Sequence, residues 1–481
     1  MRMSSLLMSC ILLGYSVRCA AQDANYWTPG YNPGGFLTPG AVIACNRDSG
    51  VLFYNPALLA YIRRNSASIS GDVYQLTSTK INNAVGKGLG LSSTSENIIP
   101  EMAAGVFAMH GRHPFVIGYA LIRNPVSSFQ ATQRKDAHQN VLNDSYSPGA
   151  ENYIGQYATH NFITETNGLL SVGFKLNDGW SAGFSVEGQF RSQSLEEDYS
   201  SRAIYNSSDT VVFPPIANSQ QNYLVTYIHA GIRFKGGLSY NRDRHHLGLL
   251  VSSPLLHLYG RGTLFADDVV NDIKDNGLDF NFLANTRQTG LKARWKVPLS
   301  IGLGYAYDYS EEGQIYASAE YFNKVGDYNI VTPRNEYFIR PDTGNVNEIT
   351  SSLLKLRDAH KAVVNFALGA SFVLKPGVLG YFSFRTDFNY ADKSLYDPNR
   401  DGIRPNLGVW DNYHLQTGIN VKKRKFNLRP GVLLSYGSSG KYRQAVNFDN
   451  ANDTNLLLGE QQDVKAHRLA IGILFAYIHN L

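Results

Sequence analysis

The stretch Val378–Tyr390 reads VLGYFSFRTDFNY, and large apolar side chains alternate in it with polar ones. Successive side chains of a β-strand point to opposite faces, so this pattern predicts a strand with one apolar and one polar face. Its length is close to the roughly ten residues that a tilted strand needs to cross the hydrocarbon of a bilayer. The apolar face is expected to hold Val378, Phe382, Phe384, Phe388 and Tyr390, and the polar face Ser383, Arg385, Asp387 and Asn389.

The same alternation recurs in Trp180–Phe190, Tyr413–Val421 and Leu469–Tyr477. About 14 such strands can be placed along the chain, which predicts an all-β fold, a transmembrane antiparallel β-barrel. A soluble β-sandwich also has alternating strands, but it does not need aromatic residues near the strand ends, as an interfacial girdle does. The candidate strands lie near 66–75, 101–110, 114–124, 166–176, 180–192, 223–235, 245–256, 297–307, 314–324, 361–374, 378–390, 412–421, 426–436 and 464–479.

Short and long connections alternate between these strands. The short ones contain Gly, Asn, Asp and Pro, which suit tight hairpins. The long ones would have about 20 to 40 residues, which is unusual inside a compact soluble domain. Outer-membrane barrels combine short periplasmic turns with long outer loops, and an even strand count places both termini in the periplasm. Short turns are expected at 111–112, 177–179, 241–244, 310–312, 375–377 and 422–424.

Charge and hydropathy exclude two other classes of protein. The formal net charge is +5, and losing Arg2 and Arg18 with the signal segment would reduce it to +3. This charge is too small and too evenly spread for a nucleic-acid-binding protein. The mean hydropathy is −0.24, and no later segment has the roughly 18 consecutive apolar residues of a transmembrane helix. A secreted chain that stays in a membrane without such a helix must close a barrel.

The N-terminus has the features of a cleaved secretory signal peptide. Arg2 is basic, Ser5–Tyr15 is a short apolar stretch, and Cys19–Ala21 supplies small residues before Gln22. We expect cleavage near Ala21 or Gln22. Beyond this segment only Cys45 remains, so neither a disulfide framework nor a cysteine metal site is expected.

Residues 23–64 are rich in Gly and Pro and show no regular period. They are either a flexible periplasmic tail or a compact plug inside the barrel. A barrel of about 14 strands has a lumen that wall side chains alone cannot fill, and the apolar content of the segment favours the plug. The predicted organisation is therefore a signal peptide over 1–22, a plug or hatch over 23–64 and a transmembrane barrel over 65–481.

Three stretches resemble the FadL family of outer-membrane transporters for long-chain fatty acids and other hydrophobic compounds. The first is similar to the family's hatch segment and ends in its Asn-Pro-Ala signature. The second is similar to the passage where a middle strand enters a long outer loop, and the third to a Leu-Pro hairpin. The chain departs from many outer-membrane barrels by lacking a terminal aromatic residue. The stretches are Gly40–Leu58, which contains Asn55, Pro56 and Ala57, then Ser253–Gly260, and Val297–Tyr305 followed by Tyr316–Tyr321.

The resemblance implies capture in an outer-loop groove, transfer to a site in the barrel, and sideways escape through a gap at a kinked third strand. The third candidate strand contains Asn124 and Pro125. Proline cannot donate to a β-ladder, so a gap at this strand is physically plausible. The alternative is that Pro125 simply ends the strand.

The resemblance also implies that Asn55, Pro56 and Ala57 lie where the plug meets the wall. Pro56 fixes its own φ and biases Asn55 to extended geometry. The Asn55 amide can satisfy exposed backbone groups. The alternative is an ordinary turn before the first strand.

Ligand-binding residues are harder to place. Apolar residues in a predicted outer loop are candidates for the site that first captures the ligand, which we call the catch. Loops packing on one another would explain these residues equally. Inward-facing Arg191, Arg385 and Arg429 could bind a ligand carboxylate, but pairing with Glu187, Glu320 or Asp387 in a polar lumen is favoured. The ligand-binding candidates are Leu255, Leu256, Leu258, Tyr259, Leu264, Phe265 and Arg385.

No enzymatic function is expected, and no cofactor or metal. The pair His245–His246 would point to opposite faces of a strand, and neither HExxH nor GxSxG occurs. A barrel hydrolase is one alternative. A FadL-like barrel that serves as a protein-secretion accessory or surface attachment factor is another. The expected partners are a hydrophobic small molecule, the lipid of a Gram-negative outer membrane and the barrel-assembly machinery, with the protein as a monomer and without nucleic acid.

Overall fold

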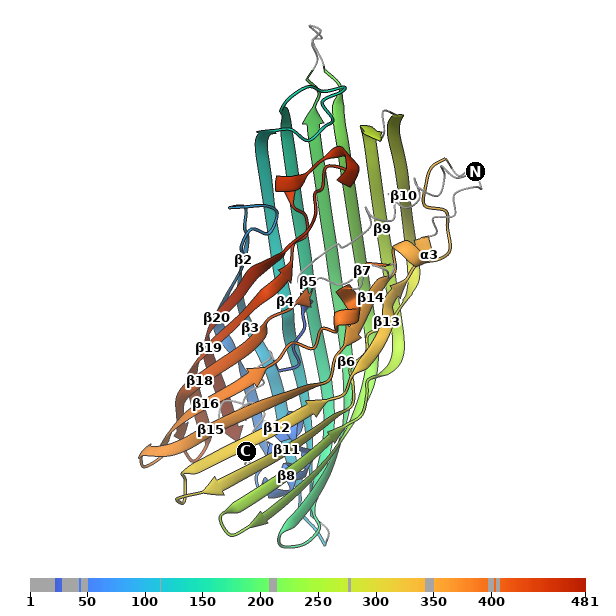
Figure 1. Ribbon diagram of the computed structural model, residues 1–481. Coiled ribbons are helices and arrows are strands. Elements are labelled where there is room, and N and C mark those ends of the chain that lie inside the picture. Colours follow the sequence, from blue (N-terminus) through green and yellow to red (C-terminus); the bar gives the residue numbers. More distant parts are fainter. Residues whose placement is uncertain are drawn as a thin grey trace.

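The computed structural model describes residues 22–27, 43–44, 51–112, 114–206, 214–275, 278–341, 350–396, 402–403 and 407–481. It is a closed antiparallel β-barrel with 14 wall strands, as the alternation predicts (Figure 1). The predicted signal peptide lies almost entirely outside the described residues. Ten wall strands are continuous: β2 Ser66–Ile81, β3 Leu91–Met109, β4 Phe115–Gln139, β5 Glu151–Lys175, β6 Trp180–Ile204, β7 Ile216–Arg242, β16 Val378–Asp387, β18 Asp411–Lys422, β19 Phe426–Arg443 and β20 Asp463–Asn480.

Each of the other four wall strands is broken into two segments. The strand after β7 shows this most clearly, because β7 pairs through Lys235–Arg242 with one segment and through Asn218–Ile232 with the other. Pro254 lies in this break, and Pro298 in the break of the next strand, where neither can donate to a ladder. The paired segments are β8 His245–Ser252 with β9 Leu256–Asp275, β11 Ser300–Asp308 with β10 Leu278–Ala293, β12 Gln314–Phe322 with β13 Val325–Thr332, and β15 Val363–Lys375 with β14 Leu356–His360.

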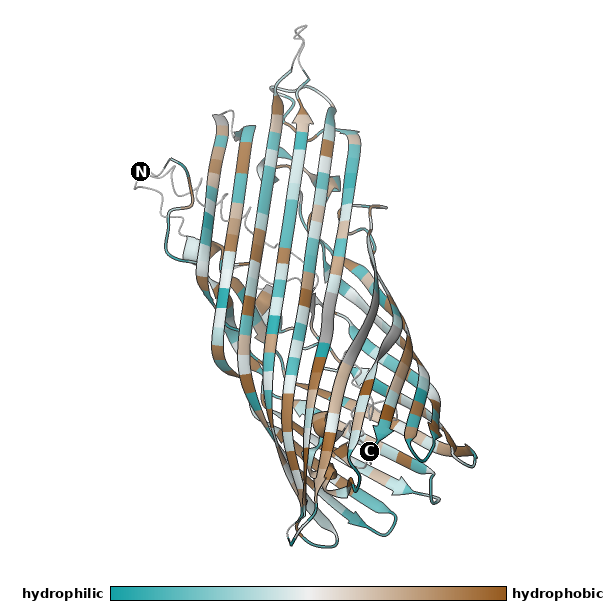
Figure 2. Cartoon of the chain, turned by 180° about the vertical axis from the view of Figure 1, so that it is seen from behind, coloured by the Kyte–Doolittle hydropathy of each residue, from teal (hydrophilic) through white to brown (hydrophobic). Residues whose placement is uncertain are grey.

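Side chains in the lower wall follow the predicted rule of apolar outside and polar inside. In β16, Phe382 and Phe384 are 45% and 37% exposed, whereas Ser383 and Arg385 are buried in the lumen. Figure 2 shows this mixture of brown and teal residues along each strand. Such an apolar exterior identifies a transmembrane barrel. The prediction that Tyr390 also faces outward is wrong, because β16 ends at Asp387 and Tyr390 is buried inside.

The predicted turns are confirmed, but several predicted long loops are strands. The connection expected between Asn124 and Thr166 consists mainly of the outer parts of β4 and β5, which pair without interruption from Ser127–Ile163 to Gln139–Glu151. The outer parts of β6, β7, β9 and β10 behave likewise. These parts stand beyond the apolar band, so their outward faces are polar. The alternation of apolar and polar side chains, on which the prediction of strands depends, is therefore lost in these parts.

Short helices and one small parallel sheet complete the fold. No helix in the described part of the chain is long and apolar enough to cross a membrane. The two-stranded sheet pairs the beginning of the described chain with a loop strand. The elements are α2 Val51–Tyr54, η3 Pro56–Tyr61, α3 Thr350–Leu353, η4 Lys393–Tyr396, η5 Phe448–Asn450, η6 Asp453–Asn455, β1 Gln22–Asp23 and β17 Leu407–Gly408.

We predict that an arginine at the centre of the apolar band destabilises the barrel. Val432 of β19 is 47% exposed on the outer face, and Val432→Arg should lower the free energy of unfolding in lipid vesicles by about 2–4 kcal/mol. Ser194→Arg, on the outward face of β6 beyond the band, is the matched control and should change it by less than about 0.5 kcal/mol. Equal effects of both substitutions would contradict the assignment of the band.

Candidate functional site in the barrel lumen

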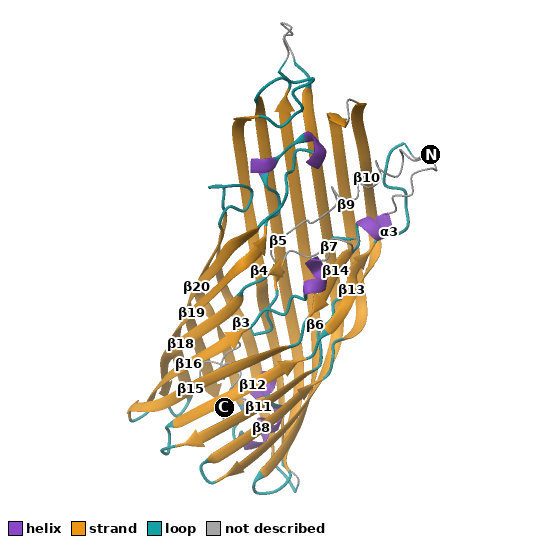
Figure 3. Cartoon of the chain, in the orientation of Figure 1, coloured by secondary structure: helices purple, strands orange, loops and turns teal. Residues whose placement is uncertain are grey.

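Part of the chain before the first wall strand lies in the lumen. Residues 43–44 and 51–62, which we call the lumenal segment, lie against the inner wall near the turn end (Figure 3). Leu52, Leu58 and Leu59 of this segment are fully buried and belong to the same apolar cluster as Met102 and Leu169 of the wall. The described residues therefore agree with a folded segment inside the barrel rather than a free tail.

Asn55 joins the lumenal segment to itself and to the wall. Its side-chain oxygen accepts a hydrogen bond from the Ala57 backbone N–H at 3.1 Å, which caps η3. Its amide nitrogen donates to the carbonyls of Ile43 at 2.6 Å and Leu238 at 3.2 Å. Asn55 is extended, with φ −136° and ψ 104°, as expected before Pro56. The predicted hatch motif thus lies at the contact with the wall.

Three inward-facing glycines make this contact possible. Gly173 of β5 is opposite Gly183 of β6, which is opposite Gly237 of β7, so the three form one row across the wall. A Cβ atom at Gly183 would lie 2.3 Å from the Pro56 carbonyl carbon, and one at Gly237 would lie 2.0 Å from Asn55 Oδ1. The backbone of the lumenal segment therefore touches the wall backbone where any side chain would displace it. Sequence reasoning missed this row, although glycines in register on neighbouring strands are its signal.

A buried lysine holds the same region. Lys235 Nζ lies 2.8 Å from a Glu187 carboxylate oxygen and donates to the Phe53 carbonyl at 3.0 Å. The ammonium group also lies 3.8 Å from the centre of the Phe53 ring. A buried charge is costly unless it is paired and hydrogen-bonded, so Lys235 and Glu187 tie α2 to β6 and β7. Glu187 is thus a partner of Lys235.

Residues Ala24–Trp27 occupy the lumen as well. The Tyr26 ring stacks between Phe322 and Tyr390, with ring centres 4.2 Å and 4.4 Å apart. The Trp27 indole N–H donates to Glu320 at 2.8 Å, and its backbone N–H donates to Asp387 at 2.9 Å. These contacts fix the beginning of the described chain to two wall strands, β12 and β16, and to Tyr390 just beyond β16. Sequence reasoning did not find them.

The middle of the lumen combines aromatic rings with paired charges. The Arg191 guanidinium lies 3.7 Å from the centre of the Trp295 ring, donates to the Tyr227 hydroxyl at 3.0 Å and forms an ion pair with Glu165. The expectation that the lumenal arginines pair with wall carboxylates is therefore met for Arg191, although its partner is Glu165. Arg385 is buried in the lumen on β16, opposite His414 of β18.

A second buried network adjoins this one. His360 Nε2 lies 2.7 Å from an Asp358 carboxylate oxygen, which also accepts from the Tyr328 hydroxyl at 2.8 Å. The other ring nitrogen of His360 is 2.8 Å from the Tyr26 hydroxyl. No group of three or more His, Cys, Asp or Glu side chains that could hold a metal occurs within the described ranges.

The predicted apolar catch is not a loop cluster. Residues 255–265 form the break and the first half of β9, where a register shift against β7 between His257 and Tyr259 interrupts the alternation of side chains. Leu255 and Leu264 are buried in an inward cluster with Tyr227 and Trp295. The other four, Leu256, Leu258, Tyr259 and Phe265, are exposed on the wall. The prediction of an outer loop at this position is wrong, and of these six only Leu255 and Leu264 can meet a molecule in the lumen.

The outer end of the lumen carries a larger apolar cluster. Tyr153, Tyr157 and Tyr199 of β5 and β6 are buried there together with Phe448 of η5. The loop that carries Phe448 is pinned to β4, because Asp449 accepts a hydrogen bond from Lys135 Nζ at 2.8 Å. Partial burial opposes ionisation, but Lys135 and the Lys87 backbone N–H hold the pKa of the Asp449 carboxyl below its ordinary value. This tie therefore persists at neutral pH and is lost only on acidification.

The wall is less continuous between β3 and β4. Their ladder runs from Met109–Phe115 to Met102–Ile122 and stops there, whereas β4 continues to Gln139 and stays paired with β5. Asn124 and Pro125 are the second and third residues beyond this stop, and the β4–β5 register shifts between Pro125 and Ser127. The alternative that Pro125 ends the strand is wrong.

Comparison with known proteins supports the fold. No family model and no curated protein matches the sequence. A FadL homologue of Pseudomonas aeruginosa is 15% identical with a TM-score of 0.58, covering 95% of this chain and 100% of its own. The chain has a FadL-type barrel fold. The toluene transporter TbuX of Ralstonia pickettii is 10% identical with a TM-score of 0.54, covering 94% and 98%. The toluene transporter TodX of Pseudomonas putida is 12% identical with a TM-score of 0.53, covering 97% and 100%.

We predict that a side chain at Gly237 dislodges the lumenal segment of this FadL-type barrel. Gly237→Val places atoms where Asn55 now lies, and such overpacking costs about 1–3 kcal/mol. Single-channel conductance in planar bilayers should rise. Gly236→Val, on the next residue of β7 where a Cβ meets nothing within 4 Å, should leave conductance unchanged. If both variants conduct alike, the contact does not hold the segment.

Proposed function

We propose that this protein is a FadL-family channel for the passive uptake of hydrophobic small molecules across a Gram-negative outer membrane. The observation that carries this proposal is an occupied lumen between an apolar outer end and an interrupted side wall. A water-filled porin needs no internal segment, whereas a channel for apolar solutes needs a path that excludes bulk water. The similar structures described as a FadL homologue and as toluene transporters support it.

The proposed path begins at the outer end of the lumen. Tyr153, Tyr157 and Tyr199 are buried there against Phe448, so in this proposal a solute reaches their rings when the η5 loop moves. Its transfer from water onto such apolar surface is favourable by roughly 25 cal/mol per Å². The path continues inward past Leu255, Leu264 and Trp295, which share one buried cluster. In this proposal the rings at the outer end take the role of the catch, together with Leu255 and Leu264.

The lumenal segment and Ala24–Trp27 are proposed to close the path. They contact the wall through Asn55, Lys235 and Asp387, so passage requires some of these contacts to open. The segment over 23–64 would then be the plug, with Asn55, Pro56 and Ala57 as its contact with the wall. Arg385 lies beside this route, where a ligand carboxylate could reach it only if it displaced lumenal partners.

The proposed exit lies sideways between β3 and β4. A solute that leaves through the wall enters the hydrocarbon directly and avoids the aqueous periplasm, which favours an apolar molecule. The ladder stop at Met102–Ile122, followed by Asn124 and Pro125, supplies the place. This arrangement serves a monoaromatic hydrocarbon and a long-chain fatty acid equally, so both are proposed substrates.

The channel function is tested by uptake of radiolabelled toluene and of a labelled long-chain fatty acid. A host strain without its own channels of this kind, expressing the protein, should take up at least one of them faster than the same strain with an empty vector. Equal uptake would contradict transport and favour a secretion or attachment role. Release of fatty acid from phospholipid by the purified barrel would instead support a hydrolase.

We predict that Pro125→Val slows uptake several-fold, because it restores a backbone donor and favours continued pairing of β4. Pro430→Val is the matched control, since Pro430 lies in β19 opposite Phe475, separated from β3 by β20 and β2. It should leave uptake at the wild-type rate. A normal rate in Pro125→Val, with the protein present at wild-type level, would exclude an exit that depends on this proline.

A further inference from the structure

The Tyr26 ring occupies a slot between two aromatic side chains of the lumen. Its centre lies 4.2 Å from that of Phe322 and 4.4 Å from that of Tyr390, and its plane is inclined to theirs by 15° and 30°. Phe322 belongs to β12 and Tyr390 follows β16, so two separate parts of the wall form the slot. Phe322 and Tyr390 are buried, whereas Tyr26 is only half-buried. The slot therefore holds one flat ring, and the residue in it keeps part of its surface accessible from the lumen.

A histidine closes the far end of the slot. His360 Nδ1 lies 2.8 Å from the Tyr26 hydroxyl, and His360 Nε2 lies 2.7 Å from an Asp358 carboxylate oxygen. That oxygen also accepts from the Tyr328 hydroxyl at 2.8 Å, and the other carboxylate oxygen accepts from the Ala359 N–H at 2.9 Å. An ionised carboxylate only accepts hydrogen bonds, so Nε2 carries a proton and Nδ1 of the neutral ring offers a lone pair to the slot.

The rings and the histidine together select a particular kind of molecule. Stacking between two rings favours a flat aromatic group. The buried lone pair of His360 Nδ1 requires a group that donates a hydrogen bond, and a hydrocarbon or an ether would leave it without a partner, which costs free energy. A phenol meets both conditions. The side chain of Tyr26 is itself a phenol that the chain carries into the slot.

Backbone and neighbouring side chains, not the Tyr26 ring, attach this segment to the wall. The Ala24 carbonyl accepts a hydrogen bond from the Tyr390 N–H at 2.8 Å. The Asn25 side-chain amide donates to the Asp387 carbonyl at 2.6 Å, and the Trp27 N–H donates to the Asp387 carboxylate at 2.9 Å. Replacing the Tyr26 side chain should therefore empty the slot while these contacts keep the segment attached.

We propose that the slot between Phe322 and Tyr390 is a binding site for phenols, which Tyr26 occupies as a tethered substitute until a free phenol displaces its ring. The inference rests on the proposed function and names a substrate class for the channel. A phenol is uncharged at neutral pH, so it can follow an apolar path, and its hydroxyl is then received by His360.

The first test measures equilibrium binding of radiolabelled phenol to the purified barrel in detergent. Tyr26→Ala should bind phenol at least about tenfold more tightly than wild type, because it removes a competitor that is tethered at high effective concentration. Tyr26→Phe should lie between them, about fivefold tighter than wild type, since its ring competes without the hydrogen bond to His360. Binding by Tyr26→Ala alone, with wild type and Tyr26→Phe equally weak, would show only a cavity made by the substitution and would overturn the proposal.

The second test compares phenol with toluene and anisole, which are similar in size but cannot donate a hydrogen bond. Tyr26→Ala should bind phenol at least about tenfold more tightly than either, because both leave His360 Nδ1 unpaired. Adding His360→Phe should remove this preference while toluene still binds, which also reports that the slot is folded. If the double variant does not assemble, the three ligands on Tyr26→Ala still decide, and equal affinities for them would overturn the proposal.

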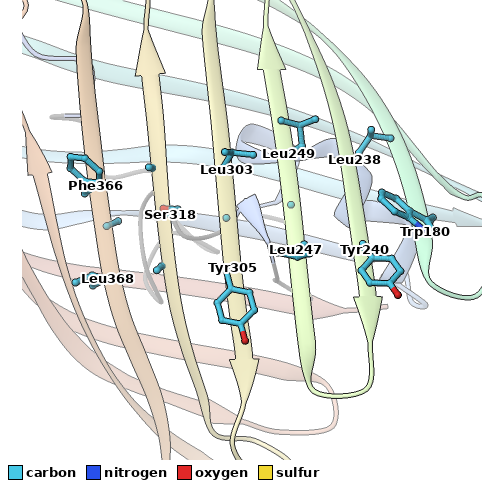
Figure 4. A pocket seen from close by; sticks show the side chains of 15 residues that line it. Trp180, Leu238, Tyr240, Leu247, Leu249, Leu303, Tyr305, Ser318, Phe366 and Leu368 are labelled. Carbon is cyan, nitrogen blue, oxygen red and sulfur yellow. The ribbon is translucent and has the colours of Figure 1, made fainter.

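An apolar groove on the outer wall supplies the background in these measurements (Figure 4). It has a volume of about 810 Å³ and is lined by exposed side chains such as Leu303 of β11 and Phe366 of β15. That volume is several times the roughly 150 Å³ that suffices for benzene, so small aromatic molecules can enter it. None of the slot variants changes a residue of the groove, so binding there cancels when the variants are compared.

Uptake measurements separate this inference from the transport function. Phenol binding with the predicted order of variants, but without uptake of phenol or toluene by cells, would contradict transport alone. Uptake of toluene without preferential phenol binding in the slot would contradict this inference alone.

Discussion

Backbone hydrogen bonding is the constraint on which the rest of this structure depends. In lipid, each N–H and C=O of the wall must be satisfied by a neighbouring strand, and the pairing of β20 with β2 closes the ring. Because closure satisfies the backbone, the side chains of the wall differ only according to whether they face the lipid or the lumen. One ladder of the wall stops early. β3 and β4 separate after Ile122, while both remain hydrogen-bonded to their other neighbours.

The interior of the barrel, unlike its lipid-facing surface, contains charged and polar side chains. Charged groups such as Lys235, Glu187 and Arg191 are buried, and each of these three has an oppositely charged partner. A chain segment fills part of the lumen because the wall bears glycine where the segment touches it. The barrel therefore encloses a second, smaller set of contacts between this segment and the inner wall.

The sequence predicted the wall well, because lipid on one side and a polar lumen on the other impose a strict two-residue period. Ser383 and Phe384 are examples whose faces follow from the pattern alone. The prediction failed beyond the bilayer, where β4 and β5 continue with polar outward faces, and at Tyr390, which turns inward after β16 ends. The hatch motif Asn55-Pro56-Ala57 could be placed from the family resemblance. The contacts of Tyr26, Trp27 and Lys235 could not, since they join residues that lie far apart in the chain without any local pattern.

The length of the tall strands has a consequence for what reaches the entrance. β5 has 25 residues and spans roughly 80 Å, against an apolar band about 25 Å tall, and Figure 1 shows β5, β6 and β7 rising far above β18 and β19. One side of the barrel thus extends far beyond the apolar band. Its inner face carries the buried tyrosine cluster of β5 and β6 well beyond the apolar band. If the protein is the channel proposed above, an oily solute would meet protein before it had to cross the hydrated surface layer of the membrane.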